Sequence, residues 1–233
     1  MVLLGFSLVF YAWGGPKYLL LLLSMVFASW IFALLIDQYR ESGRSKLFLI
    51  CDCVFMLGLL CIFKYLTFFS SITNTIFHFP KEIPQIALPI GISFYTLQAI
   101  GYMVDVYWGK VKAERELWRT ALFLGFFPQI MEGPIARYTD VADTLYTDKP
   151  LEYKNVCDGY VRIFWGLFKK KVVADRLATV VAAIFDHYTN YSGAIIVVGA
   201  ISYAVQLYME FSGCMDIVIG SGRVFGILLP ENC

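Results

Sequence analysis

Two carboxylates and an amide interrupt the otherwise apolar stretch YAVQLYMEFSGCMDIVIG at 203–220. Gln206 and Glu210 are four residues apart and share one face of a helix, whereas Asp216 lies about 120° further round. Ionised carboxylates in lipid cost several kcal/mol, so these side chains should face protein or water. If Ser212 and the glycine after it break the helix, Asp216 returns to the face of Glu210. We predict that all four side chains line an internal polar cavity; polar contacts that only join helices are the alternative.

A second polar pair, Gln98 and Asp105, lies in the apolar stretch 88–110. The two residues are seven apart and therefore share a helix face, and the helix breakers Pro89 and Gly91 stand near the start of the stretch. Two interpretations remain open. The pair lines a wall of the internal cavity, or the helix packs on its neighbours through small residues.

A third pair, Gln129 and Glu132, lies in the sixteen residues TALFLGFFPQIMEGPI at 120–135. Two prolines and a glycine in this stretch prevent a regular helix. Broken backbone at membrane depth is tolerated where it is buried in protein or lines a wet cavity. We predict a re-entrant hairpin that exposes both polar side chains to the cavity. The alternative is a single span that places 138–158 outside the membrane.

Apolar blocks must hold these candidate residues in place. The chain is 59% hydrophobic and only 16% charged, where a soluble domain carries about 25% charge. Four blocks at 18–36, 47–63, 84–104 and 193–209 are long enough, or nearly so, to cross a membrane. Four such blocks cannot share one soluble core. The sequence therefore predicts an all-α polytopic integral membrane bundle that forms a single domain over 1–233.

Basic residues indicate the orientation of the bundle. They cluster at 40–46, 110–119 and 169–171, and the positive-inside tendency places all three clusters in the cytoplasm. The loop at 70–83 has few charges and is predicted outside. Since 120–135 is too short to cross twice, the last two clusters require it to enter and leave on one side.

The stretch 158–188 differs from the predicted spans, because a charged stripe runs through it. Arg162, Lys169, Asp175 and Arg176 accompany apolar faces. This pattern predicts a pair of amphipathic helices, interfacial or buried, rather than a plain span.

Several function classes are excluded by the composition. The net charge is +1 with no dominant basic stripe, so no nucleic-acid partner is predicted. The cysteines lack CxxC spacing, so neither a metal site nor a disulfide framework is predicted, and no bound cofactor is expected. The two histidines, His78 and His187, have no serine or cysteine partner at a recognisable spacing. No catalytic residue is therefore predicted.

Five strings along the chain carry a family resemblance. In order they are FYAWGGPKYLLLLL (10–23), LPIGISFYTLQAIGYMVDVYWG (88–109), FFPQIMEGPIARY (126–138), FWGLFKKKVVADRLA (164–178) and QLYMEFSGCMDIVIGSGRVFGILLPEN (206–232). Together they resemble the membrane-bound O-acyltransferase family. The nearest branch is the bacterial one with the alginate O-acetylation proteins and the D-alanyl transferases of teichoic acids.

The resemblance implies an acyltransferase of the bacterial inner (plasma) membrane, with many passes through the lipid bilayer. Its helices would ring a tunnel between the two membrane faces, with Glu210 where the family usually has aspartate. The acyl donor, acyl coenzyme A or an acyl carrier protein, would arrive from the cytoplasm as co-substrate. An acyl group, often acetyl, would pass to a hydroxyl of a cell-envelope polysaccharide or related polymer. The partner outside would be that polymer or a secreted acyltransferase.

This sequence departs from the family pattern at two places. The two family histidines, one in a tryptophan-histidine motif, lie downstream of the string PEN at 230–232, and this sequence stops at Cys233. The resemblance therefore implies a fragment, truncated at both ends and inactive alone. Met131 and Glu132 also stand where the family commonly has small apolar residues.

Two other functions remain open. Broken helices and buried carboxylates also suit a transporter or channel, although such a protein would show an inverted repeat and none is found. A non-catalytic membrane scaffold that binds an envelope partner is the other alternative.

Overall fold

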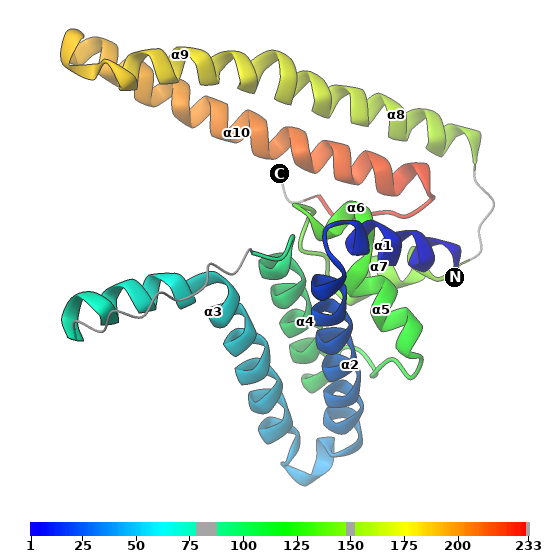
Figure 1. Cartoon of the computed structure of the whole chain (residues 1–233). Coiled ribbons are helices and arrows are strands. Elements are labelled where there is room, and N and C mark those ends of the chain that lie inside the picture. Colours follow the sequence, from blue (N-terminus) through cyan, green and yellow to red (C-terminus); the bar gives the residue numbers. More distant parts are fainter. Residues whose placement is uncertain (78–87, 148–151, 232–233) are drawn as a thin grey trace. The chain divides into compact units, whose positions relative to one another are not determined.

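The computed structural model of the chain describes residues 1–77, 88–147 and 152–231. Across these residues it contains helices and no strand, which confirms the all-α prediction (Figure 1). Two compact units divide the chain: Met1–Met131 with Ile135–Ala142, and Glu132–Pro134 with Asp143–Cys233. That one membrane domain covers 1–233 stays a prediction.

The first unit is built mainly from six α-helices. Their bounds are α1 Val2–Trp13, α2 Pro16–Gln38, α3 Ser45–Phe77, α4 Ile92–Tyr107, α5 Leu117–Gly125 and α6 Phe127–Ile130, with a short 3₁₀ turn, η1, at Arg40–Ser42. Helix α7, Tyr138–Leu145, begins in this unit and ends in the second. Pro16 suits the first position of α2, where its missing N–H would be unpaired in any case.

Helix α4 begins after a glycine that no other residue could replace without strain. Gly91 has φ +72°, in the left-handed region, and a Cβ built on it would lie 1.8 Å from the carbonyl oxygen of Ile130. The start of α4 and the end of α6 therefore touch, backbone to backbone. The breaker predicted from the sequence is confirmed, and its reason is this close approach.

The second unit is a long helical hairpin. Its elements are α8 Tyr153–Leu167, a π-helical segment η2 at Phe168–Ala174, α9 Asp175–Asp186, a short 3₁₀ turn η3 at Tyr188–Asn190, and α10 Gly193–Val224. Figure 1 shows α8 and α9 running alongside α10. Helices α8 and α9 occupy the stretch 158–188 where a helix pair was predicted, and η2 joins them without a break.

Three helices are long and apolar enough to cross a membrane. They are α2, the Ser45–Leu66 part of α3, and α10, with mean hydropathies of 2.7, 2.3 and 1.6. They cover the blocks predicted at 18–36, 47–63 and 193–209, which are therefore helical and long enough to cross. The fourth predicted block is confirmed as helix only from Ile92, and α4 has 16 residues, fewer than the roughly 20 that a span needs.

The predictions for the loop at 70–83 and for the hairpin at 120–135 have different outcomes. Helix α3 continues to Phe77, so the loop expected from residue 70 is wrong up to that point, and 78–83 lie outside the described residues. The stretch 120–135 is broken as predicted, since α5 ends at Gly125 and Phe126 is extended before α6 starts. Re-entry of this stretch on one membrane side, like the interfacial position of α8 and α9, stays a prediction.

Candidate functional site

The predicted site residues fall into two groups, one in each unit. Gln98, Asp105 and Gln129 belong to the first unit. The second unit contains the other five, which are Glu132, Gln206, Glu210, Ser212 and Asp216. Within each group only some of the residues lie together. A single tunnel lined by both groups stays a prediction.

In the first unit, Gln98 and Gln129 lie together. Gln98 on α4 and Gln129 on α6 are 5% and 4% exposed. The Gln98 amide donates to the carbonyl oxygen of Phe123 at 3.1 Å and accepts from the Gln129 amide at 3.4 Å. Buried amides need such partners, so this contact fixes α4 against α5 and α6. Asp105 is also buried but stands about 10 Å further along α4, where it pairs with Lys110 at 3.6 Å.

Helix α10 is continuous through the residues where a break was predicted. It runs from Gly193 to Val224, so the expectation that Ser212 and Gly213 interrupt it is wrong. Gly213 has a different role, because a Cβ built on it would lie 2.8 Å from the carbonyl oxygen of Gly166. The reciprocal distance, from a Cβ on Gly166 to the carbonyl oxygen of Gly213, is 2.5 Å.

A second glycine pair repeats this contact seven residues away. Cβ atoms built on Gly159 and Gly220 would lie 2.8 and 2.7 Å from the partner's carbonyl oxygen. We call these four residues the glycine seam. Small residues let helix backbones approach closely, which is how membrane helices commonly associate. The seam brings α8 and η2 close enough to α10 for their polar side chains to meet.

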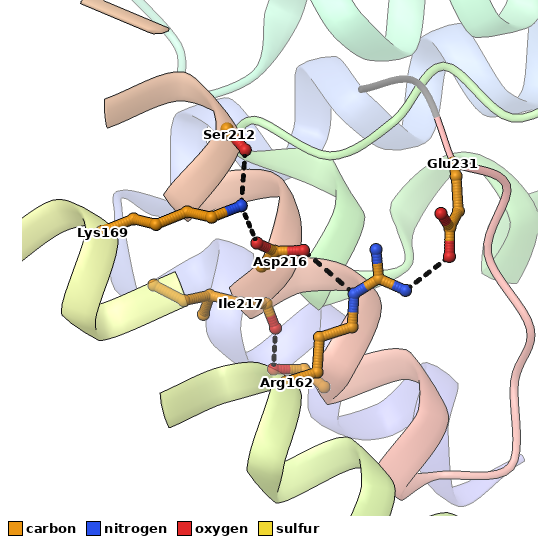
Figure 2. Close-up of polar contacts among 7 residues, drawn as sticks. Arg162, Lys169, Ser212, Asp216, Ile217 and Glu231 are labelled. Carbon is orange, nitrogen blue, oxygen red and sulfur yellow. Dashed lines mark hydrogen bonds and ion pairs between the residues drawn. The ribbon is translucent and has the colours of Figure 1, made fainter. Parts of the chain in front are cut away.

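Asp216 lies between two basic side chains at this interface (Figure 2). Arg162 Nε donates to its Oδ1 at 3.0 Å, and Lys169 Nζ donates to its Oδ2 at 2.6 Å. Lys169 also donates to Ser212 Oγ at 2.8 Å. All four side chains are largely buried, with Asp216 at 11% side-chain exposure and Arg162 at 22%. The structure thus confirms that Ser212 and Asp216 lie together and adds the two cations.

The other candidates on α10 are less enclosed. Glu210 pairs with Lys170 at 3.3 Å and keeps 45% of its side chain exposed. The buried Oε1 of Gln206 accepts no hydrogen bond from any residue that the structure describes. Glu132 is exposed, and its carboxylate lies within hydrogen-bonding reach of the Cys214 thiol.

Arg162 also joins the helices to the segment after α10. Its Nη1 donates to Glu231 Oε1 at 2.6 Å, and Figure 2 shows the guanidinium between Asp216 and Glu231. This contact lowers the pKa of the Glu231 carboxyl, because the guanidinium stabilises its charged form. A hydrogen bond from the Leu228 amide to Thr144 Oγ1 holds the same segment.

Sequence reasoning missed the basic partners of the carboxylates. Lys169 and Lys170 were assigned to a cytoplasmic cluster, yet both face α10, and only Lys171 pairs outward, with Asp175 at 3.0 Å. Their charges are compensated inside the protein, so they are weaker topology markers than free lysines would be. One feature of the sequence could have indicated this pairing. Arg162 and Lys169 are seven residues apart, as are Gly159 and Gly166, so both pairs repeat along one helix at the same spacing.

Charge is balanced across this polar cluster, which we define as Arg162, Lys169, Lys170, Glu210, Ser212, Asp216 and Glu231. Three cations face three carboxylates. The cluster has no histidine, and His187 is exposed at the end of α9. No metal-binding group of three or more side chains occurs among the described residues. The arrangement can hold α8 and η2 in register with α10, and every carboxylate in it pairs with a basic side chain.

Comparisons with known proteins identify the family of the chain. No family model matches the chain. The chain is 34% identical to the peptidoglycan O-acetyltransferase of Helicobacter pylori, over 97% of this chain and 48% of the relative. It is 35% identical to the probable alginate O-acetylase AlgI of Pseudomonas aeruginosa, over 100% of this chain and 45% of the relative. The chain belongs to the membrane-bound O-acyltransferase family.

Membership in the membrane-bound O-acyltransferase family confirms the resemblance seen in the five strings. A teichoic acid D-alanyltransferase of Bacillus subtilis is also similar, at 26% identity over 61% of this chain and 37% of that protein. The three apolar helices and these relatives together establish a membrane protein. The chain spans about half the length of these two O-acetylation relatives.

Proposed function

We propose that this chain is part of a bacterial inner-membrane O-acyltransferase that transfers an acyl group to a hydroxyl of a cell-envelope polysaccharide. The acyl group that we propose is acetyl. One observation carries the proposal. Two relatives, named for O-acetylation of peptidoglycan and of alginate, match almost the whole chain at 34% and 35% identity. Both polymers are polysaccharide-based, so the shared acceptor chemistry is a sugar hydroxyl.

The reaction needs a donor thioester and a base. A general base takes the proton of the acceptor hydroxyl, the oxygen attacks the thioester carbonyl, and the thiol leaves as the ester forms. We assign the donor to acyl coenzyme A or an acyl carrier protein on the cytoplasmic side. The acceptor polymer, or a secreted partner that completes its modification, is assigned to the opposite side.

We assign positioning roles to the residues of this chain. The polar cluster and the glycine seam hold α8 and η2 against α10, so that the face with Gln206 and Glu210 can line the acyl-transfer tunnel. The buried amides of Gln98 and Gln129 would hold α4 against α5 and α6 within the first unit. The support is their burial and pairing. The base is assigned to a histidine outside these 233 residues, in line with the family resemblance.

Disruption of the complete gene tests the function. Acetate released by mild base should fall in one purified envelope polymer of the disrupted strain and return when the gene is restored. Peptidoglycan and exopolysaccharide are measured separately, so the affected fraction identifies the acceptor class. Unchanged base-released acetate in every polymer fraction, with the protein demonstrably made in the parent strain, would refute the proposed reaction.

A further inference from the structure

The first unit contains an apolar cavity that none of the candidate site residues lines. It has a volume of about 610 Å³ and lies between α1, α2 and α5. Its walls include Leu8 on α1, Phe27 on α2 and Ala121 on α5. Every lining side chain is apolar or aromatic. Ligand pockets usually measure about 300–1,000 Å³, so this cavity can hold a substantial molecule.

The chemistry of the walls favours a hydrocarbon occupant. A cavity without polar partners does not retain ordered water. One wall belongs to α2, a candidate membrane span, and Phe27 and Leu23 on that wall are 50% and 36% exposed. Surfaces of this kind face lipid tails in a membrane protein, and a tail that enters the cavity meets only apolar atoms.

One end of the cavity carries groups that suit a lipid headgroup. The Phe27 ring lies 6.1 Å from the ring of Trp30, whose indole N–H donates to the backbone oxygen of Arg115 at 3.1 Å. Arg115 precedes Leu117, another wall residue, by two positions. Tryptophan and arginine together are typical of the membrane–water interface.

Arg115 is free to bind an anion. Its side chain is exposed and makes no ion pair with any residue in the described parts of the chain, whereas Arg119 nearby pairs with Glu114 and Glu116. The segment 110–119 is also predicted to lie on the cytoplasmic side, where the membrane surface is anionic. The backbone of Arg115 lies near this end of the cavity, and its side chain offers a positive charge that complements a phosphate headgroup, because the neighbouring carboxylates of Glu114 and Glu116 pair with Arg119.

We propose that the cavity binds one acyl chain of an anionic phospholipid, with the headgroup phosphate on Arg115. This site is independent of the acyl-transfer reaction and would be occupied with or without a donor. One basic side chain raises the affinity for an anionic membrane surface about fivefold. We therefore expect Arg115 to favour an anionic headgroup over one without net charge by about the same factor.

Native mass spectrometry of the chain in detergent micelles tests the proposal. The probes are phosphatidylglycerol and phosphatidylcholine with identical acyl chains, added in equal amounts. The expected result is one retained phospholipid per chain, with phosphatidylglycerol preferred about fivefold. Absence of a retained lipid, or equal retention of both headgroups, would overturn it.

Two pairs of variants test lipid retention by the cavity and headgroup preference separately. Ala121→Phe places a ring inside the cavity and should weaken retention of both lipids, while Ala204→Phe, on the exposed face of α10, should not. Arg115→Gln changes an exposed side chain and should remove the headgroup preference, while Arg44→Gln, in another basic segment predicted to be cytoplasmic, should leave it unchanged. Full retention in folded Ala121→Phe, or full preference in Arg115→Gln, overturns the assignment. So would a chain dimer that Ala121→Phe dissociates, because a second copy would then occupy the cavity.

Discussion

At the scale of single residues, Asp216 is held by two basic side chains of the second unit. It accepts hydrogen bonds from Arg162 and Lys169 at 3.0 and 2.6 Å in a largely buried setting. Removing one member of a buried ion pair is costly because the remaining charge keeps its desolvation penalty. Here two cations would lose their partner together, so the stability of the hairpin depends strongly on this carboxylate.

Asp216→Asn should therefore lower the free energy of unfolding by about 3 kcal/mol, since two half-buried cations lose their counter-charge. Denaturant titration in mixed micelles measures this change. Asp175→Asn is the matched control, because Asp175 pairs with Lys171 on the surface, where both side chains are about half exposed or more. Its effect should stay near 0.5 kcal/mol. Equal losses in the two variants would show that the buried ion pairs of Asp216 contribute no more to the free energy of unfolding than a surface pair does.

The contact between Arg162 and Glu231 predicts a dependence on pH. The pKa of Glu231 is lowered by its hydrogen bond from Arg162, so the contact contributes above the ordinary pKa of a glutamate and is lost as pH falls through the lowered value. Selective ¹³C labelling of glutamate side chains would measure the titration by NMR. In Arg162→Gln the pKa of Glu231 should rise toward its ordinary value. An unchanged titration curve in that variant contradicts the contact.

Part of this residue-scale chemistry could be predicted from the sequence. Ser212 and Asp216 do lie together, and Glu210 and Asp216 both pair with basic side chains. That these carboxylates face a wet passage in the membrane stays a prediction. The nature of the partners was missed. Basic side chains of η2 and α8 were read as surface charge, because pairing across two helices depends on which faces meet, and spacing within one helix does not give that.

At the scale of helices, the glycine seam sets how closely α8 and η2 approach α10. Its two contacts are seven residues apart on each side, and each glycine faces a backbone carbonyl of the partner helix. The sequence predicted both helices but read Gly213 as a breaker. A glycine in an apolar helix is compatible with either role, and only the partner glycine at 166 decides between them.

Gly166→Ala should lower the free energy of unfolding by about 2 kcal/mol, since the new Cβ would lie 2.5 Å from the carbonyl oxygen of Gly213 and the helices must move apart. The control is Gly101→Ala on α4, where a Cβ meets nothing within 4 Å. That change should raise stability by up to about 1 kcal/mol through better helix propensity. Denaturant titration measures both. A neutral Gly166→Ala would mean that the hairpin tolerates a wider spacing.

The π-helical segment at Phe168–Ala174 is the element that sequence reasoning had least chance of finding. Apolar periodicity identifies a helix but does not distinguish π from α geometry within one run. π-helical turns often occur at functional sites. In this chain the segment contains Lys169 and Lys170, the two lysines that reach the carboxylates of α10.

At the scale of the whole molecule, the chain combines three apolar spans with polar groups that are paired inside each unit. The fold class and the family followed from composition and from ordered strings, because both are properties of the whole sequence. Assignment of a tunnel across both units did not follow, since it depends on how the units meet. The two polar sites are nevertheless the parts of the chain that an acyl-transfer path could use.

Transfer of radiolabelled acetyl from acetyl coenzyme A to envelope polymer tests the account most directly. Inverted membrane vesicles of the gene-disrupted strain, restored with the complete gene and sealed around acceptor polysaccharide, would be supplied from outside with acetyl coenzyme A or, in parallel, acetylated acyl carrier protein. Label in the purified polysaccharide would then be counted. The account predicts label well above the unrestored vesicles. With Asp216→Ala it predicts a loss of up to about 100-fold, because misplacing the helices misplaces the reacting groups, and no loss with Asp175→Asn. No label above the unrestored vesicles, with the protein present and folded, would contradict the account.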